Sequence, residues 1–242
     1  MYTLIRLSLT LFGCLMCVST AVSYQEIQVK NGGAISGHVL LEGTIPTPGV
    51  LPVQKNREVC GEQVPDQSLI VSVNHAVKNV TVMLDGIRAG KPAHTQLAVL
   101  DNKACAFVPR VQTLTVGQTL ELRNSDPILH DAHALLPSFD TLFNLGLPEW
   151  RQVRHTMQET GRIVVDCNVL HTWMRAYLIV TEHPYTAVTD AAGRFSLDQV
   201  PAGEYTLQLW HERLGEMVQA VSVGENQELS LTLEYDEKND KR

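Results

Sequence analysis

The stretch Gly161-Arg-Ile-Val-Val-Asp-Cys-Asn-Val-Leu-His-Thr-Trp-Met174 joins a strand pattern to a cluster of metal-binding side chains. The apolar run 162–165 predicts a β-strand. Cys167, His171 and Met174 follow it with the spacing C-x3-H-x2-M. Thiolate, imidazole and thioether are ligands for a soft metal ion, and a short loop can turn all three toward one centre. The stretch therefore predicts three ligands of a metal site at the end of a strand.

A second segment supplies a candidate for the remaining ligand. Residues 119–123 have the alternating pattern of a strand and lead into Asn124-Ser-Asp-Pro-Ile-Leu-His130, a loop bent at its proline. Two such strands side by side in a sandwich would bring His130 next to Cys167. His133 is the alternative ligand, but residues three apart in an extended chain face different ways. We therefore expect only one of these two histidines to bind the ion.

The rest of the chain predicts an all-β fold. Short β-branched and aliphatic runs recur between Gly, Pro and Asn-Asp breaks, as in antiparallel sandwiches or barrels. These runs are 34–41, 69–73, 77–84, 95–100, 112–116, 119–123, 161–167, 175–181, 187–189, 194–197, 204–210, 217–223 and 228–235.

Composition excludes several classes of protein. The 242 residues are 44% hydrophobic, which is enough for a sizeable core and excludes disorder of the whole chain. The formal net charge is −7 and aromatic residues make up 6%. An acidic chain lacks the Lys and Arg clusters that neutralise phosphates, and few aromatic rings are present to stack on bases. We therefore expect no nucleic-acid partner.

The N-terminus is typical of a secretory signal peptide. Arg6 precedes an apolar run, and Ala21-Val-Ser23 resembles a cleavage site, so residues 1–23 are predicted to be removed. The alternative is an uncleaved membrane anchor, although the run is short for a bilayer. After cleavage we expect a chain that begins near Tyr24, has no stable membrane span, and is periplasmic or secreted.

Taken together, Asn124–His130 and the C-x3-H-x2-M loop resemble the cupredoxins, the β-sandwich copper proteins that include plastocyanin, amicyanin and azurin. The loop spacing is similar to the last part of the binuclear copper loop of cytochrome oxidase subunit II. That loop has a second Cys four residues earlier, where this chain has Ile163. Mononuclear cupredoxins often have two or four residues between Cys and His, whereas this chain has three.

The resemblance implies a Greek-key sandwich over residues 94–182 with one mononuclear copper per chain. His130, Cys167 and His171 would be the main ligands and Met174 a longer axial one. The implied role is one-electron transfer with redox partner proteins of the envelope, as in exported copper proteins of the methylamine-utilisation type. Trp173, beside His171, would then belong to a docking surface around an exposed histidine edge.

The cysteines give a further expectation. Removal of the signal peptide leaves Cys60, Cys105 and Cys167, so at most two can pair. Since the resemblance assigns Cys167 to the metal, we expect a Cys60–Cys105 disulfide. An intermolecular bond, or a Cys60–Cys167 bond that would abolish the copper site, remains the alternative.

The segments that flank the copper unit resemble a different module. Residues 186–210, with Thr189-Asp190-Ala-Ala-Gly193-Arg-Phe195 followed by Pro201-Ala-Gly-Glu-Tyr205, are similar to the carboxypeptidase regulatory-like (transthyretin-like) β-sandwich, and residues 35–39 resemble its opening strand. We therefore divide the mature chain into N-terminal strands 24–93, the cupredoxin-like unit 94–182, a regulatory-like unit 183–236 and a flexible tail 237–242. The first and third segments are interpreted as one sandwich that the copper unit interrupts.

Three functions follow from these patterns. Electron transfer is the first, a copper carrier or resistance protein with the same ligands is the second, and a metal-free binding or structural module of the envelope is the third. We expect no enzyme, because the chain has no G-x-S-x-G elbow, no H-E-x-x-H motif and no phosphate-binding loop.

Overall fold

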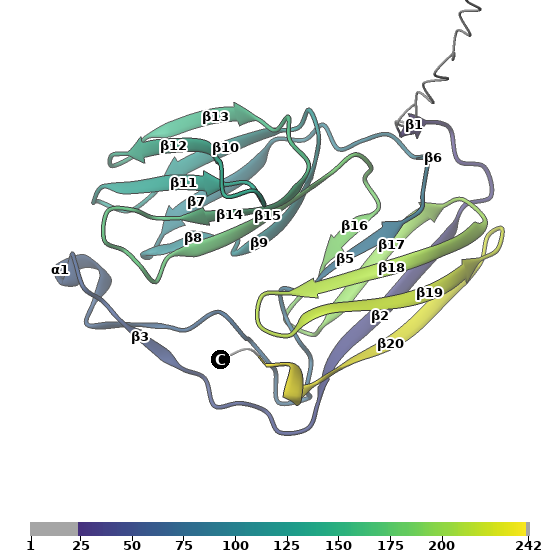
Figure 1. Cartoon of the computed structure of the whole chain (residues 1–242), viewed down its shortest axis with the longest axis horizontal. Helices are drawn as coiled ribbons and strands as arrows, with labels where there is room; N and C mark the ends of the chain where they lie inside the picture. Colours follow the sequence, from purple (N-terminus) through teal and green to yellow (C-terminus); the bar gives the residue numbers. More distant parts are fainter. Residues whose placement is uncertain (1–23, 241–242) are drawn as a thin grey trace, which may run out of the picture.

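The computed structural model describes residues 24–240, which are almost entirely β-structure (Figure 1). This confirms the all-β fold class. The predicted signal peptide 1–23 lies outside the described residues. Among residues 24–240, no helix is both long enough and apolar enough to span a membrane.

The elements in chain order are β1 (Gln25–Glu26), β2 (Gly33–Glu42), β3 (Val50–Pro52), α1 (Arg57–Cys60), β4 (Gln63–Pro65), β5 (Thr81–Asp85), β6 (Ala89–Gly90), β7 (Ala98–Lys103), β8 (Ala106–Val108), β9 (Val111–Thr115), β10 (Thr119–Asn124), β11 (His130–Leu135), β12 (Thr141–Leu147), β13 (Gln152–Thr156), β14 (Gly161–Asp166), β15 (Arg175–Thr181), β16 (Thr186–Val188), β17 (Arg194–Val200), β18 (Gly203–His211), β19 (Gly215–Val223), β20 (Glu228–Asp236) and the 3-10 helix η1 (Glu237–Asn239).

A central sandwich is formed by β7 to β15 (Figure 1). One sheet has the strand order β13-β10-β7-β8 and the other β12-β11-β14-β15-β9. Leu120 and Leu122 of β10 and Ile163 and Val165 of β14 are fully buried and belong to one core cluster. The alternation that marked residues 119–123 and 161–167 as strands is therefore the alternation of inward and outward side chains.

A flanking sandwich lies beside it and combines the two ends of the sequence. Its sheets have the orders β16-β5-β18-β19 and β17-β2-β20. Strand β2 lies between two C-terminal strands, antiparallel to β17 and parallel to β20. Its Ile35 and Val39 share a core with Phe195 and Leu207. Sequence segments on either side of the central sandwich thus close one hydrophobic core, while the resemblance to a transthyretin-like module stays a prediction.

Residues 50–65 leave this flanking sandwich and run along the central one. We call this segment the strap; it contains β3, α1 and β4, of which β3 and β4 pair with each other. Val53 of the strap is fully buried in the core of the central sandwich. Cys60, the last residue of α1, forms a disulfide with Cys105 in the turn between β7 and β8. The predicted Cys60–Cys105 pairing is confirmed, and Cys167 is a free, buried cysteine.

The predicted flexible tail 237–242 lies partly within the described residues, and its flexibility stays a prediction. Residues Glu237–Asn239 form η1, whose first turn is capped by the Asp236 carboxylate accepting from the Lys238 backbone N–H at 2.9 Å. Asp240 forms an ion pair with Arg213. The charged residues of this segment are therefore held by partners in the fold, and residues 241 and 242 lie outside the described range.

Gly193 gives a test of the turn before β17. Its φ of +70° is unfavourable for L-residues, and a Cβ there would lie 2.5 Å from the Val39 carbonyl oxygen. We expect Gly193→Ala to lower the free energy of unfolding by about 1–3 kcal/mol. Gly86 also has a positive φ (+86°), but a Cβ added there would meet nothing within 4 Å, so Gly86→Ala is the matched control. Equal losses in urea unfolding would contradict a steric contribution at Gly193.

Candidate metal centre

The ends of two neighbouring strands bring the predicted ligands together. Strand β11 begins at His130, and Cys167 directly follows the last residue of β14. Because β11 and β14 pair antiparallel, with His133 opposite Asp166, the start of one lies beside the end of the other. His130, Cys167 and His171 are 0%, 4% and 0% exposed, so the cluster they form is closed to solvent.

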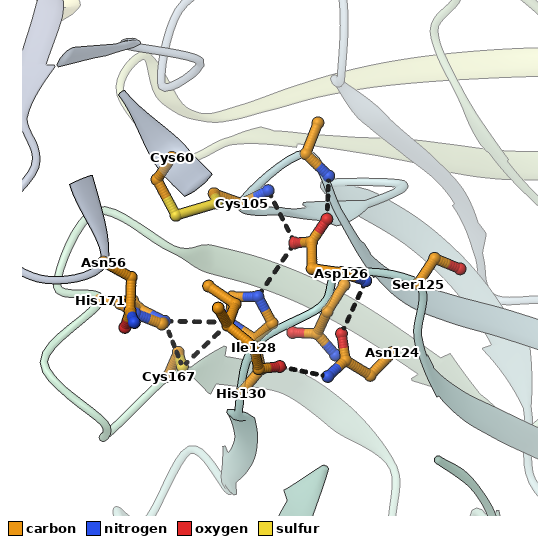
Figure 2. A network of polar contacts seen from close by, with 12 residues as sticks. Asn56, Cys60, Cys105, Asn124, Ser125, Asp126, Ile128, His130, Cys167 and His171 are labelled. Carbon is orange, nitrogen blue, oxygen red and sulfur yellow. Dashed lines mark hydrogen bonds and ion pairs between the residues drawn. A yellow bond between two sulfur atoms is a disulfide. The ribbon is translucent and has the colours of Figure 1, made fainter. Parts of the chain in front are cut away.

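Three potential ligand atoms converge in this cluster, as Figure 2 shows. The Nδ1 atoms of His130 and His171 lie 2.9 Å apart. The Cys167 Sγ lies 3.9 Å from Nδ1 of His130 and 3.6 Å from Nδ1 of His171. Residues 37 and 41 positions apart in the sequence thus place two imidazole nitrogens and one sulfur around a common point.

A carboxylate determines the tautomer of His130. The Asp126 Oδ2 accepts from His130 Nε2 at 2.9 Å, and a carboxylate in this role requires the proton on Nε2. Asp126 is itself held, because it also accepts the backbone N–H groups of Ala104 at 2.7 Å and Cys105 at 2.8 Å. His130 therefore presents the unprotonated Nδ1 to the cluster.

An amide from the strap does the same for His171. The Asn56 Oδ1 lies 2.9 Å from His171 Nε2, and the Asn56 Nδ2 donates to Glu58 Oε1 at 3.2 Å (Figure 2). Since the amide nitrogen is engaged by Glu58, the amide oxygen faces the imidazole and accepts its Nε2–H. Both histidines therefore turn an Nδ1 lone pair inward, the arrangement that outer hydrogen bonds impose on metal-binding histidines.

This arrangement fits a metal ion better than it fits an ordinary polar core. Two unprotonated Nδ1 atoms at 2.9 Å have no hydrogen between them, and the one thiol proton of Cys167 can bond to only one of them. Buried lone pairs without a donor are unfavourable. A cation between the three atoms would satisfy all of them, and imidazole with thiolate is a donor set that suits copper.

The histidine pKa values favour the ligand form of both rings. Burial, together with the nearby His130 and Lys55, lowers the pKa of His171 to about 4. Burial also lowers the pKa of His130, although Asp126 opposes that shift. Both imidazoles are therefore neutral at pH 7, the state in which a ring nitrogen binds a metal.

The thiol of Cys167 is held by the loop opposite. The Asp131 backbone N–H donates to Cys167 Sγ at 3.4 Å, and the Asp131 Oδ1 accepts the backbone N–H of Asn168 at 2.5 Å. Burial raises the pKa of Cys167, so without a cation the group is a neutral thiol. A bound metal ion supplies the positive charge that releases its proton.

The other residues of the loop are close by, but one prediction about them is wrong. Met174 is 2% exposed, lies in the same core cluster, and donates its backbone N–H to the His171 carbonyl at 2.9 Å. The Trp173 indole donates to the Cys105 carbonyl at 2.9 Å and is 8% exposed. The predicted docking surface around an exposed His171 edge is contradicted, because His171 is fully buried and the strap covers that edge.

Of the two alternative histidines, the structure brings His130 to the cluster and turns His133 away. His133 is partly exposed, its Nδ1 lies 2.8 Å from Asn168 Nδ2, and its Nε2 lies 2.9 Å from Thr141 Oγ1. The odd spacing of three positions along β11 puts the two rings on opposite faces of the sheet.

Asp126 and Asn56 were not among the residues predicted from the sequence. Asp126 carries a local signal, since it lies four residues before His130 in the loop Asn124-Ser-Asp-Pro, where turn-forming side chains gather. Asn56 carries none, because it lies 115 positions from His171 in an ordinary polar segment.

No protein-family model and no curated protein matches the chain. Among solved structures, it is similar to a Cu-containing nitrite reductase from Thermus scotoductus (22% identity, TM-score 0.34, 39% of this chain and 24% of the other). It is also similar to a purple cupredoxin from Nitrosopumilus maritimus (22% identity, TM-score 0.31, 35% of this chain and 99% of the other). A third is amicyanin from Paracoccus versutus (20% identity, TM-score 0.32, 37% of this chain and 84% of the other). The chain thus spans about a quarter of the reductase and most of each of these two cupredoxins.

Proposed function

We propose that this chain is an exported copper protein with one mononuclear site and a role in one-electron transfer. His130, Cys167 and His171 would hold the ion, with Met174 as a weaker fourth ligand. The observation that carries the proposal is the convergence of two Nδ1 lone pairs and a thiol while both Nε2 atoms are occupied by Asp126 and Asn56.

Outer hydrogen bonds hold each of the three converging side chains. Asp126 and Asn56 hold the two rings, and Asp131 holds both Cys167 Sγ and the Asn168 N–H. Ligands held in this way need to move little when the charge of the centre changes, which favours rapid electron exchange. Copper supplies a one-electron couple when bound to thiolate and imidazole.

Burial supports electron transfer over catalysis. The three converging residues are 0–4% exposed, so a substrate molecule has no direct access to the cluster. Electrons, unlike substrates, can pass through a few ångströms of packed protein. The partners that we propose are therefore redox proteins of the envelope, and the proposed location is the periplasm or the exterior.

The test is a Cu(II) titration of residues 24–242 followed by absorption and EPR spectroscopy. We expect an intense thiolate-to-copper band that saturates at one copper per chain, and reversible reduction and reoxidation of the bound ion. Absence of the band would contradict the proposed site. A band combined with rapid loss of copper to a chelator, and no reversible couple, would instead favour a copper carrier.

A further inference from the structure

The strap places Asn56 against the Nε2 edge of His171. On one side Val53 is fully buried in the central core, and its carbonyl accepts from Arg57 Nε at 2.8 Å. On the other side the Asn56 carbonyl accepts from Cys60 N at 2.9 Å, and Cys60 is tied to Cys105 by the disulfide. Asn56 thus lies in the sequence between the buried Val53 and the Cys60–Cys105 disulfide, and Figure 2 shows the disulfide near it.

The backbone at Asn56 is adapted to this position. Its φ of +59° and ψ of +40° place it in the left-handed region, which Asn and Gly adopt at lower cost than other residues. Its side chain does not cap α1. The amide oxygen points instead to His171 Nε2 and accepts its hydrogen bond, so the side chain orients the histidine and does not cap the helix.

The same covalent link organises the partner of the other histidine. Cys105 donates its backbone N–H to Asp126, and Asp126 accepts from His130 Nε2. The disulfide therefore joins the segment that holds the outer partner of His171 to the turn that holds the outer partner of His130. The hydrogen-bond partners of both imidazole rings are therefore connected through the same disulfide.

We propose that Asn56 is a positioning residue for His171, an inference that rests on the proposed copper function. It accepts the Nε2–H, keeps Nδ1 directed to the centre, and closes the histidine edge to solvent. The strap thereby slows exchange of the ion with solvent. Because the His171 edge is covered, an electron has to leave the site through the surrounding protein and not through a solvent-exposed histidine.

Two substitutions separate the amide from the backbone. Asn56→Gly keeps the left-handed conformation and removes the acceptor, whereas Asn56→Asp keeps an acceptor at the same place and loses only the hydrogen bond to Glu58. Glu62→Gln is the matched control, since it alters only an exposed ion pair between Arg57 and Glu62 at 3.4 Å on the same strap.

The first readout is transfer of copper from the loaded protein to an excess of a water-soluble chelator. Loss of an outer hydrogen bond to a metal-binding histidine typically weakens metal binding by roughly 10–100-fold. We expect Asn56→Gly to accelerate copper loss at least about 10-fold and to shift the absorption and EPR spectra. Glu62→Gln should lose copper as slowly as the wild type, and Asn56→Asp, which keeps the acceptor, should lose copper more slowly than Asn56→Gly. Wild-type behaviour of Asn56→Gly would overturn the proposal.

The second readout does not need copper. Nitrogen-15 NMR of the metal-free chain distinguishes the two neutral tautomers of His171, and we expect the Nε2–H form in the wild type and in Asn56→Asp. In Asn56→Gly the tautomers should mix. If the wild type bound no copper, the proposed function would fail while this measurement still decided the role of Asn56. An unchanged tautomer in Asn56→Gly would contradict it.

Discussion

Replacing Cys167 with Ser is expected to abolish the thiolate-to-copper absorption band and to weaken Cu(II) binding by more than roughly 100-fold. The reason is that the hydroxyl of Ser does not ionise at neutral pH, so the site would lose its only anionic ligand among the converging atoms. Loss of a ligand should exceed the roughly 10–100-fold effect of losing an outer partner. Competition titration against a chelator of known affinity, with absorption spectra, measures both quantities.

Two histidine variants provide the controls for that measurement. His130→Ala removes one converging Nδ1 and should also lose the band, because only Sγ and one imidazole would remain and two such ligands are too few to hold the ion in this geometry. His133→Ala should keep the band and the affinity, since its ring bonds to Asn168 and Thr141 outside the cluster. A band that survives Cys167→Ser, or that disappears in His133→Ala, would contradict the ligand set.

Removal of the disulfide by the double substitution Cys60→Ser and Cys105→Ser should lower the free energy of unfolding by about 4 kcal/mol. The bond links residues separated by 45 positions, and cross-linking a loop of that length reduces the entropy of the unfolded chain by about this amount. The strap also loses its covalent anchor, whereas Val53 stays buried.

Urea unfolding of the metal-free chain measures this loss without the contribution of copper. The wild type treated with a thiol reductant gives an independent value, because reduction breaks the same bond without changing the sequence. Asn56→Gly serves as the control in which the strap loses its contact with His171 while the disulfide stays intact, and we expect a smaller loss of unfolding free energy there. A loss below about 1 kcal/mol in the double variant would show that the fold does not depend on this link.

The strands predicted from the sequence differ from strand β11, which was not predicted, in the polarity of their buried residues. Residues 119–123 and 175–181 read as strands because one face is buried among apolar neighbours. Strand β11 was not predicted because it begins with His130 and Asp131, two polar residues that are buried beside the candidate metal centre. Polar residues thus stand where apolar residues would have completed the alternation of this strand.

The sequence by itself determined the all-β class and the Cys-His-Met loop, because each depends on local pattern. The pairing of Cys60 with Cys105 was expected only from the resemblance that assigns Cys167 to the metal, and the structure decided it among the alternatives. Only the tertiary structure decided that His130 and not His133 meets Cys167, since that choice depends on which face of β11 turns inward. It also decided that Asn56 covers His171 and Asp126 holds His130. Partners as much as 115 positions apart meet through packing of sheets and strap, and no local periodicity encodes such a contact.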